Sequence, residues 1–142
     1  MNLLLALLFQ VLTTIYSHTH EETGLLITIN NIKSIGGHVQ IAVYNDEISY
    51  MSDKVYKYHS AKVGKNGNLE IRLENIEKGS YSICIFHDEN DNGKLDKNFL
   101  GMPIEPYGFS NNPKIFFSPP GFKDTMINVD PEHTRNVSIE LR

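Results

Sequence analysis

The chain has 142 residues, with 13 Lys and Arg against 17 Asp and Glu and a formal net charge of −4. This length allows one domain with a sizeable core and is too short for two comfortable ones. Acidic and basic residues are interspersed and form no basic stripe, which argues against nucleic acid as a partner. The single cysteine, Cys84, cannot form an intrachain disulfide, so we expect a small buried side chain there rather than a reactive thiol.

The N-terminal segment has the composition of a secretory signal. MNLLLALLFQVLTTIYS, residues 1–17, has no charged side chain, and its apolar run from Leu3 to Leu12 is too short to span a bilayer as a helix. We therefore expect a signal peptide over 1–17, cleavage after Ser17, and a mature domain over 18–142 that is periplasmic or secreted and has no further contact with a membrane. An uncleaved membrane anchor is the alternative.

Cleavage after Ser17 would create a new N-terminus, His18-Thr19-His20. A free amine, two amide nitrogens and an imidazole at the third residue form a planar site that suits Cu(II) or Ni(II). His18 and His20 are therefore an alternative metal site. The competing interpretation is a disordered polar tail before the first strand.

Alternation of apolar and polar residues with a period of two dominates the rest of the chain. It predicts strands in LLITIN (25–30), HVQIAVYN (38–45), YHSAKV (58–63), LEIRLENI (69–76) and NVSIELR (136–142). YSICIF (81–86) is apolar on both faces and predicts a central strand. About seven short strands with turn residues between them predict an all-β fold, a single β-sandwich of the transthyretin-like or immunoglobulin-like kind.

One long stretch lacks the strand pattern, from Asp88 to about Phe122, and so long a connection is rarely without a function. Counted from Asp88, it begins as D-x-[DN]-x-[DN]-G, the start of a calcium loop. Alternate residues of such a loop converge on one point, and calcium takes six to eight oxygen ligands. We predict a calcium site formed by Asp88, Asn90, Asn92, the Lys94 carbonyl and Asp96.

The loop departs from the helical version of the motif. Phe99 stands at position twelve, where a bidentate Glu is usual, and no helix signal flanks the loop. Asp91 or Glu105 could replace the missing ligand. Two certain carboxylates imply weak binding, with a Kd on the order of 10⁻⁴–10⁻³ M. The alternative is a turn whose Asn and Asp side chains bond their own backbone.

The stretch GSYSICIFHDENDNGKLDKNFLGMPIEPYGFSNN resembles the signature of a bacterial secreted family, domain of unknown function 2141. The shared motifs are a G-x-Y-A-I strand, H-D-x-N-x-N-G-x-x-D and L-G-x-P-x-E-x-Y-G-F-S-N-N. The resemblance extends to LLITINNIKSIGGHVQIAVYN and PPGFKDTMINV, with Ser82 and Pro106 as departures from the usual Ala and Gly. It implies export and brings no established activity.

The end of this stretch groups aromatic, amide and hydroxyl side chains. A small ligand or glycan could bind there, in a site made of Glu105, Tyr107, Phe109, Ser110, Asn111 and Asn112. The competing interpretation is that the aromatic rings cover an open end of the core while the amides cap backbone groups.

Catalytic patterns are weak in this sequence. A glycosidase needs two carboxylates across a cleft, and no spacing pairs Glu89, Glu105 and Asp124. Ser110 does not lie in a G-x-S-x-G turn, and His87 has no second zinc ligand at the usual spacing. We expect a non-catalytic exported module that binds calcium and contacts a cell-surface protein or glycan, with a ligand-binding domain as the second possibility and a hydrolase as the third.

Overall fold

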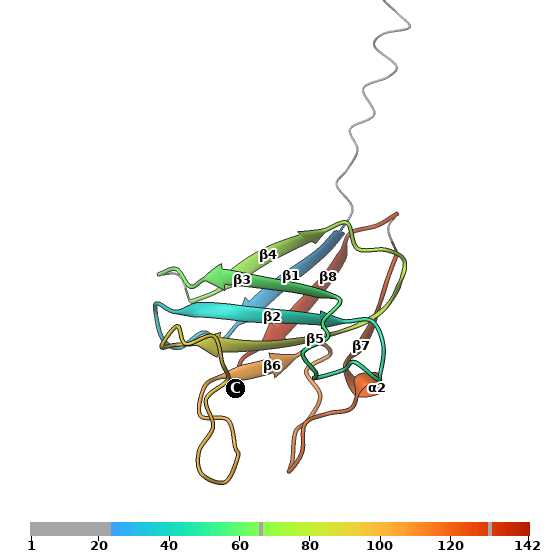
Figure 1. Cartoon of the computed structure of the whole chain (residues 1–142). Helices are drawn as coiled ribbons and strands as arrows, with labels where there is room; N and C mark the ends of the chain where they lie inside the picture. Colours follow the sequence, from blue (N-terminus) through green and yellow to red (C-terminus); the bar gives the residue numbers. More distant parts are fainter. Residues whose placement is uncertain (1–23, 66, 131) are drawn as a thin grey trace, which may run out of the picture.

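The computed structural model describes residues 24–65, 67–130 and 132–142 (Figure 1). The predicted signal peptide and the candidate copper or nickel residues His18 and His20 lie outside the described residues. The elements are β1 (Gly24–Asn30), β2 (His38–Tyr44), β3 (Lys57–Lys62), β4 (Leu69–Glu74), β5 (Gly79–Asp88), β6 (Tyr107–Phe109), α2 (Phe122–Thr125), β7 (Met126–Val129) and β8 (Arg135–Glu140). In this part of the chain, no helix has the length and apolar character needed to cross a membrane.

The strands form two sheets, which lie one behind the other in Figure 1. The smaller sheet has the order β4-β1-β8, and its β1–β8 pair is parallel. The larger sheet has the order β3-β2-β5-β6, and β7 also pairs with β5. β6 and β7 share one edge of β5, since β7 pairs with its first half and β6 with its second half. β5 is therefore the central strand that the apolar run 81–86 predicted.

The core lies between the two sheets. Alternate residues of each strand point into it, as the period of two requires. The smaller sheet contributes buried side chains from Leu25, Ile27, Ile29, Ile71, Leu73, Val137 and Ile139, and the larger sheet contributes Val39, Ile41, Val43, Tyr81, Ile83, Ile85, Ile127 and Val129. The prediction of a single all-β sandwich is confirmed.

The long connection after Asp88 is more ordered than the sequence predicted. It contains β6, which pairs with Cys84–Phe86 of β5, and an isolated bridge between Lys97 and Pro103. β6 has only three residues, with a glycine in the middle, so it carries no periodic signal of its own. Together with β7 it brings the number of strands in the described ranges to eight, where the sequence predicted about seven.

Candidate functional site

Asp88, the first residue of the predicted calcium loop, is the last residue of β5, and its side chain is 1% exposed. Its carboxylate accepts hydrogen bonds from the Gly93 backbone N–H (2.8 Å), the Gln40 Nε2 (3.1 Å) and the Asn92 backbone N–H (3.0 Å). Burial acts to raise the pKa of this carboxyl, but the N–H donors outweigh it and hold the pKa below its ordinary value. Asp88 is therefore ionised and fixes the start of the loop to the sheet.

The side chains of Asn90 and Asn92 converge on Asp96. Asn90 Nδ2 donates to Asp96 Oδ2 at 2.6 Å, and Asn92 Nδ2 donates to Asp96 Oδ1 at 3.0 Å. Each amide oxygen also accepts a backbone N–H two residues on, from Asn92 (3.1 Å) and from Lys94 (2.8 Å). The chain can turn this tightly because Asp91 (φ 59°) and Gly93 (φ 75°) adopt the left-handed conformation.

Glu105 closes the loop from its far end. Its carboxylate accepts the Glu89 backbone N–H with Oε1 and the Asp96 backbone N–H with Oε2, both at 3.0 Å, and the side chain is buried. Both of its oxygens thus hold the two ends of the loop together. Asp91, the other suggested replacement ligand, contacts His38 Nδ1 at 2.6 Å. The structure therefore gives Glu105 a positioning role that the sequence did not indicate.

The donor set of this loop fits a weak calcium site. Three side-chain oxygens each accept one backbone N–H and have a second lone pair that could bind an ion: Asp88 Oδ1, Asn90 Oδ1 and Asn92 Oδ1. The Asp96 carboxylate faces two amide groups, whose oxygens are ligands that calcium accepts. Lys94 would supply its carbonyl oxygen, and its side chain is exposed. The site would hold only two carboxylates, so we expect low affinity.

The turn before β2 packs directly under the loop. Gly37 has φ +66°, and a Cβ at this position would lie 2.2 Å from the carbonyl oxygen of Asp88, so only glycine fits. The buried side chain of His87 reaches the same turn, with Nε2 at 2.8 Å from the Gly36 oxygen. Its Nδ1 has no hydrogen-bond partner within the described ranges and lies 3.9 Å from Glu89 Oε1.

The polar residues after β6 bond to backbone groups of three strands. Ser110 Oγ accepts the Ile83 backbone N–H at 3.0 Å, and Asn111 Nδ2 donates to the Met126 oxygen at 2.8 Å. Asn112 donates to the Ser138 oxygen at 2.8 Å and accepts the Glu140 backbone N–H at 2.9 Å. Asn112 thus connects the end of the larger sheet to β8 of the smaller sheet.

Tyr107 and Phe109 lie apart from these amides and line a groove of about 340 Å³ on the outer side of the larger sheet. The groove is also lined by Tyr58 and Phe86, by Leu95 of the candidate calcium loop and by Lys97, which follows that loop. The sequence did not predict it, because its walls come from β2, β3, β5, β6 and two connections. Cys84 also lies in this groove, and burial raises the pKa of its thiol to about 12.

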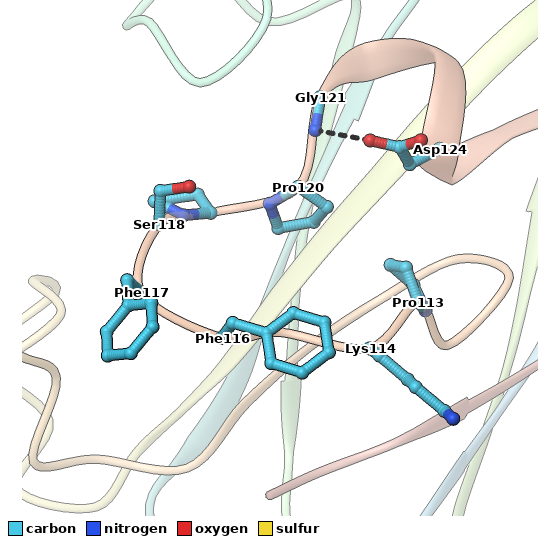
Figure 2. A pocket seen from close by; sticks show the side chains of 9 residues that line it. Pro113, Lys114, Phe116, Phe117, Ser118, Pro120, Gly121 and Asp124 are labelled. Carbon is cyan, nitrogen blue, oxygen red and sulfur yellow. Dashed lines mark hydrogen bonds between the residues drawn. The ribbon is translucent and has the colours of Figure 1, made fainter.

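A hollow of about 550 Å³ lies along the loop before α2 (Figure 2). The base of this loop is fixed by a hydrogen bond from the Gly121 backbone N–H to Asp124 Oδ2 (3.0 Å) and by one from Arg142 Nη1 to the Pro113 oxygen (2.9 Å). Phe116 and Phe117 lie farther out and are exposed. The hollow is lined by prolines and phenylalanines together with Lys114, Ser118 and Asp124. The Asp124 carboxylate already accepts the Gly121 backbone N–H.

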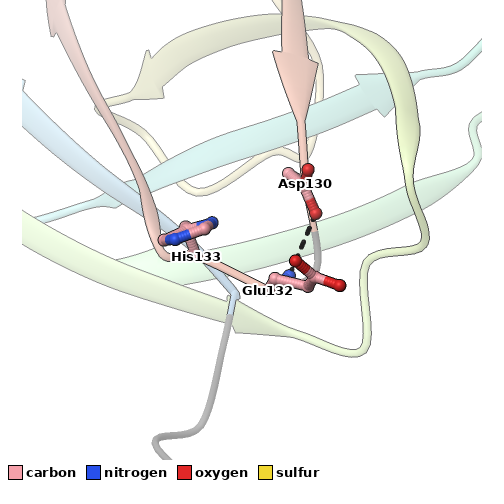
Figure 3. A group of neighbouring side chains, drawn as sticks. All are labelled: Asp130, Glu132 and His133. Carbon is pink, nitrogen blue, oxygen red and sulfur yellow. Dashed lines mark hydrogen bonds between the residues drawn. The ribbon is translucent and has the colours of Figure 1, made fainter.

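One cluster of possible metal ligands lies between β7 and β8 (Figure 3). Ligand atoms of Asp130, Glu132 and His133 lie within 4.8 Å of one another. Asp130 accepts the Glu132 backbone N–H at 3.1 Å with its side chain, and the pKa of this carboxyl is lowered mainly by that bond. Lys78 Nζ lies 3.6 Å from the same carboxylate. These contacts are typical of a surface turn. The Asp130 carboxylate already has an N–H donor and a lysine as partners, so the cluster gives no support for a metal ion.

The comparisons agree with the resemblance seen in the sequence. Residues 27–137 match the family described as "Uncharacterized protein conserved in bacteria (DUF2141)". Neither a curated protein nor a solved structure matches the chain. The matched range contains the candidate calcium loop, Glu105 and the residues after β6. The chain therefore belongs to the bacterial family DUF2141.

Proposed function

We propose that the protein is an exported, non-catalytic β-sandwich module that binds one calcium ion in the loop 88–96. The observation that carries the proposal is the convergence of Asn90 and Asn92 on the Asp96 carboxylate, next to the ionised and buried Asp88. Calcium would replace the two amide N–H groups as the partner of Asp96, with the amide oxygens turned to the ion. A non-catalytic role is supported by Glu105, because both of its oxygens hold backbone N–H groups.

The expected affinity suits a site outside the cell. A site with two carboxylates has a Kd of about 10⁻⁴–10⁻³ M, and such sites fill at extracellular calcium concentrations. Binding would hold the loop rigid at the end of β5, beside Leu95 and Lys97 of the groove. A partner of the module, a cell-surface protein or a glycan, would then meet an ordered surface.

A thermal melt in calcium and in chelator tests the site. At 1 mM calcium the folded state should gain roughly 0.4–1.4 kcal/mol, which for this size raises the Tm by about 1–5 °C. Magnesium should have a smaller effect, because it demands a tighter octahedral cage. Asp96→Asn should abolish the calcium response, whereas Asp53→Asn, a change at an exposed aspartate between β2 and β3, should preserve it.

Asp88→Ala is less suitable as a test, because it would remove the buried acceptor of the Gln40 side chain and the acceptor of the Gly93 backbone N–H, and so disturb the end of β5 itself. Equal melts in calcium and chelator, with no heat of binding in calorimetry at millimolar calcium, would contradict the proposal. The loop would then be a turn held by its own Asn and Asp side chains.

A second candidate function is the binding of a glycan in the groove. The favouring observation is that Tyr107 and Phe109 lie there with Tyr58 and Phe86, since aromatic rings pack against the apolar faces of sugars, and Lys97 supplies a charged group. Tyr107→Ala should abolish signals of the protein on a glycan array. Phe117→Ala removes an exposed ring outside the groove and should leave them unchanged.

A further inference from the structure

Two surface segments carry most of the exposed apolar side chains. We call residues 97–104 the apolar hairpin and residues 113–121 the proline-rich loop. Of the eleven large hydrophobic side chains that are exposed in the described ranges, these segments hold six: Phe99, Leu100, Met102, Ile104, Phe116 and Phe117. Phe99 is 95% exposed and Phe117 is fully exposed. In Figure 1 both segments extend from the same side of the molecule, below β6.

The apolar hairpin satisfies its own backbone. Asn98 accepts the Gly101 backbone N–H with its carbonyl oxygen (2.9 Å), and its side-chain oxygen accepts those of Leu100 (2.9 Å) and Met102 (3.1 Å). The Ile104 N–H donates to the Asp96 oxygen at 2.9 Å. A hairpin built in this way presents its apolar side chains outward and still leaves few backbone donors that need water. This is the condition for entering a medium of low polarity.

The proline-rich loop has fewer backbone donors by composition. Pro113, Pro119 and Pro120 have no N–H group to satisfy. Figure 2 shows Phe116 and Phe117 on the outer arm of the loop, away from the pinned end at Gly121 and Asp124. The rings therefore lie away from the hydrogen-bonded base of the loop.

The charge of the two segments differs from that of the whole protein. The chain has a net charge of −4, but the only charged side chains of the two segments are Lys97 and Lys114. Cations next to exposed aromatic and aliphatic groups match the chemistry of an anionic lipid surface, where headgroups attract lysine and apolar side chains enter the headgroup boundary.

We propose that the apolar hairpin and the proline-rich loop insert their tips into the surface of a membrane that contains anionic lipid. This reverses the expectation, drawn from the sequence, that the mature chain has no contact with a membrane. Lipid is favoured over a protein partner because each segment combines its exposed apolar groups with a lysine, and anionic headgroups attract that cation. The proposal does not depend on calcium, so its test is run in chelator.

The chain has no tryptophan, so a single Trp placed at a tip reports on that tip alone. Phe99→Trp and Phe117→Trp should shift their emission to the blue with vesicles of phosphatidylcholine and phosphatidylglycerol, and less with vesicles of phosphatidylcholine alone. Ile48→Trp is the matched control: Ile48 is 97% exposed but follows Asp46 and Glu47, and its emission should not change. An equal shift of all three reporters would overturn the proposal.

Sedimentation with the same vesicles tests the contribution of the rings. The double variant Phe99→Ser, Phe117→Ser should bind at least about tenfold more weakly, because partitioning scales with the apolar area that enters the interface. Ile48→Ser should bind like the unchanged protein, and matching melts establish that all variants fold. Absence of sedimentation with either vesicle would refute the proposal. So would a blue shift without vesicles that follows protein concentration, since the tips would then contact a second copy of the chain.

Discussion

The side chain of Gln40 connects the outer face of β2 to the buried carboxylate of Asp88 at the end of β5. Its Nε2 donates to Asp88 Oδ2 at 3.1 Å, and its Oε1 accepts a hydrogen bond from the Tyr58 hydroxyl. Tyr58 and Gln40 line the groove, whereas Asp88 begins the candidate calcium loop. The two candidate sites therefore share a polar connection.

Gln40→Leu should destabilise the fold by about 1–3 kcal/mol, because it removes a buried donor from the ionised Asp88 and an acceptor from Tyr58. Tyr58→Phe removes only the outer hydroxyl and should cost about 0.5–1.5 kcal/mol. Urea unfolding of both variants measures the difference. Equal losses would mean that the bond to Asp88 contributes nothing.

Glu105→Gln should lower the free energy of unfolding by about 1–3 kcal/mol. The amide would point an N–H group at one of the two backbone N–H donors, from Glu89 or Asp96, that the carboxylate now accepts. Chemical denaturation is the measurement. Glu77→Gln, at an exposed glutamate before β5, is the control and should leave stability unchanged. Similar values for the two variants would contradict the positioning role of Glu105.

Asn112→Asp should weaken the connection between the sheets by about 1–3 kcal/mol. Aspartate keeps the acceptor for the Glu140 N–H, but it places a carboxylate oxygen against the Ser138 oxygen in place of a donor. Aspartate, like asparagine, tolerates the left-handed conformation of residue 112 (φ 46°), so backbone strain does not contribute to the measured loss of stability. Asn45→Asp, at an exposed residue, should have little effect on the urea midpoint.

Asp88 should make stability depend on acid pH. Its pKa in the folded state is lowered, because the donors from Gly93, Gln40 and Asn92 outweigh the effect of burial. Its contribution to stability is therefore complete above the unfolded pKa of about 3.9 and is lost as the pH falls through the lower folded pKa. Urea midpoints between about pH 5 and pH 3 should fall less steeply for Asp88→Asn than for the unchanged protein. If the urea midpoints of the two proteins fell in parallel with pH, the Asp88 carboxylate would be excluded as a cause of the acid destabilisation.

Cys84 should react slowly with alkylating reagents in the folded protein. Burial raises the pKa of its thiol to about 12, so the thiolate that alkylating reagents attack is scarce near neutral pH. Iodoacetamide should modify the protein much faster in urea than in buffer, as mass spectrometry can follow. A native rate close to the unfolded rate would mean that the thiol is accessible and ionised.

The sequence by itself determined the two layers and the loop. Period-two alternation requires that one face of each strand be buried, and in the strand predicted over 25–30 the alternate residues Leu25, Ile27 and Ile29 lie in the core. The calcium-loop pattern is also local, because Asn90 and Asn92 lie within six residues of Asp96 and reach it within one turn of the chain.

Only the tertiary structure decided how distant segments meet. β6 becomes a strand because β5 offers it an unpaired edge, and no pattern within Tyr107–Phe109 shows this. Glu105 was expected at a ligand site, but the fold brings it beneath Glu89 and Asp96, where two backbone N–H groups need an acceptor. The groove and the Gln40–Asp88 bond likewise depend on which strands are neighbours. Strand order follows from the packing of the whole chain, and a local pattern of apolar residues does not encode it.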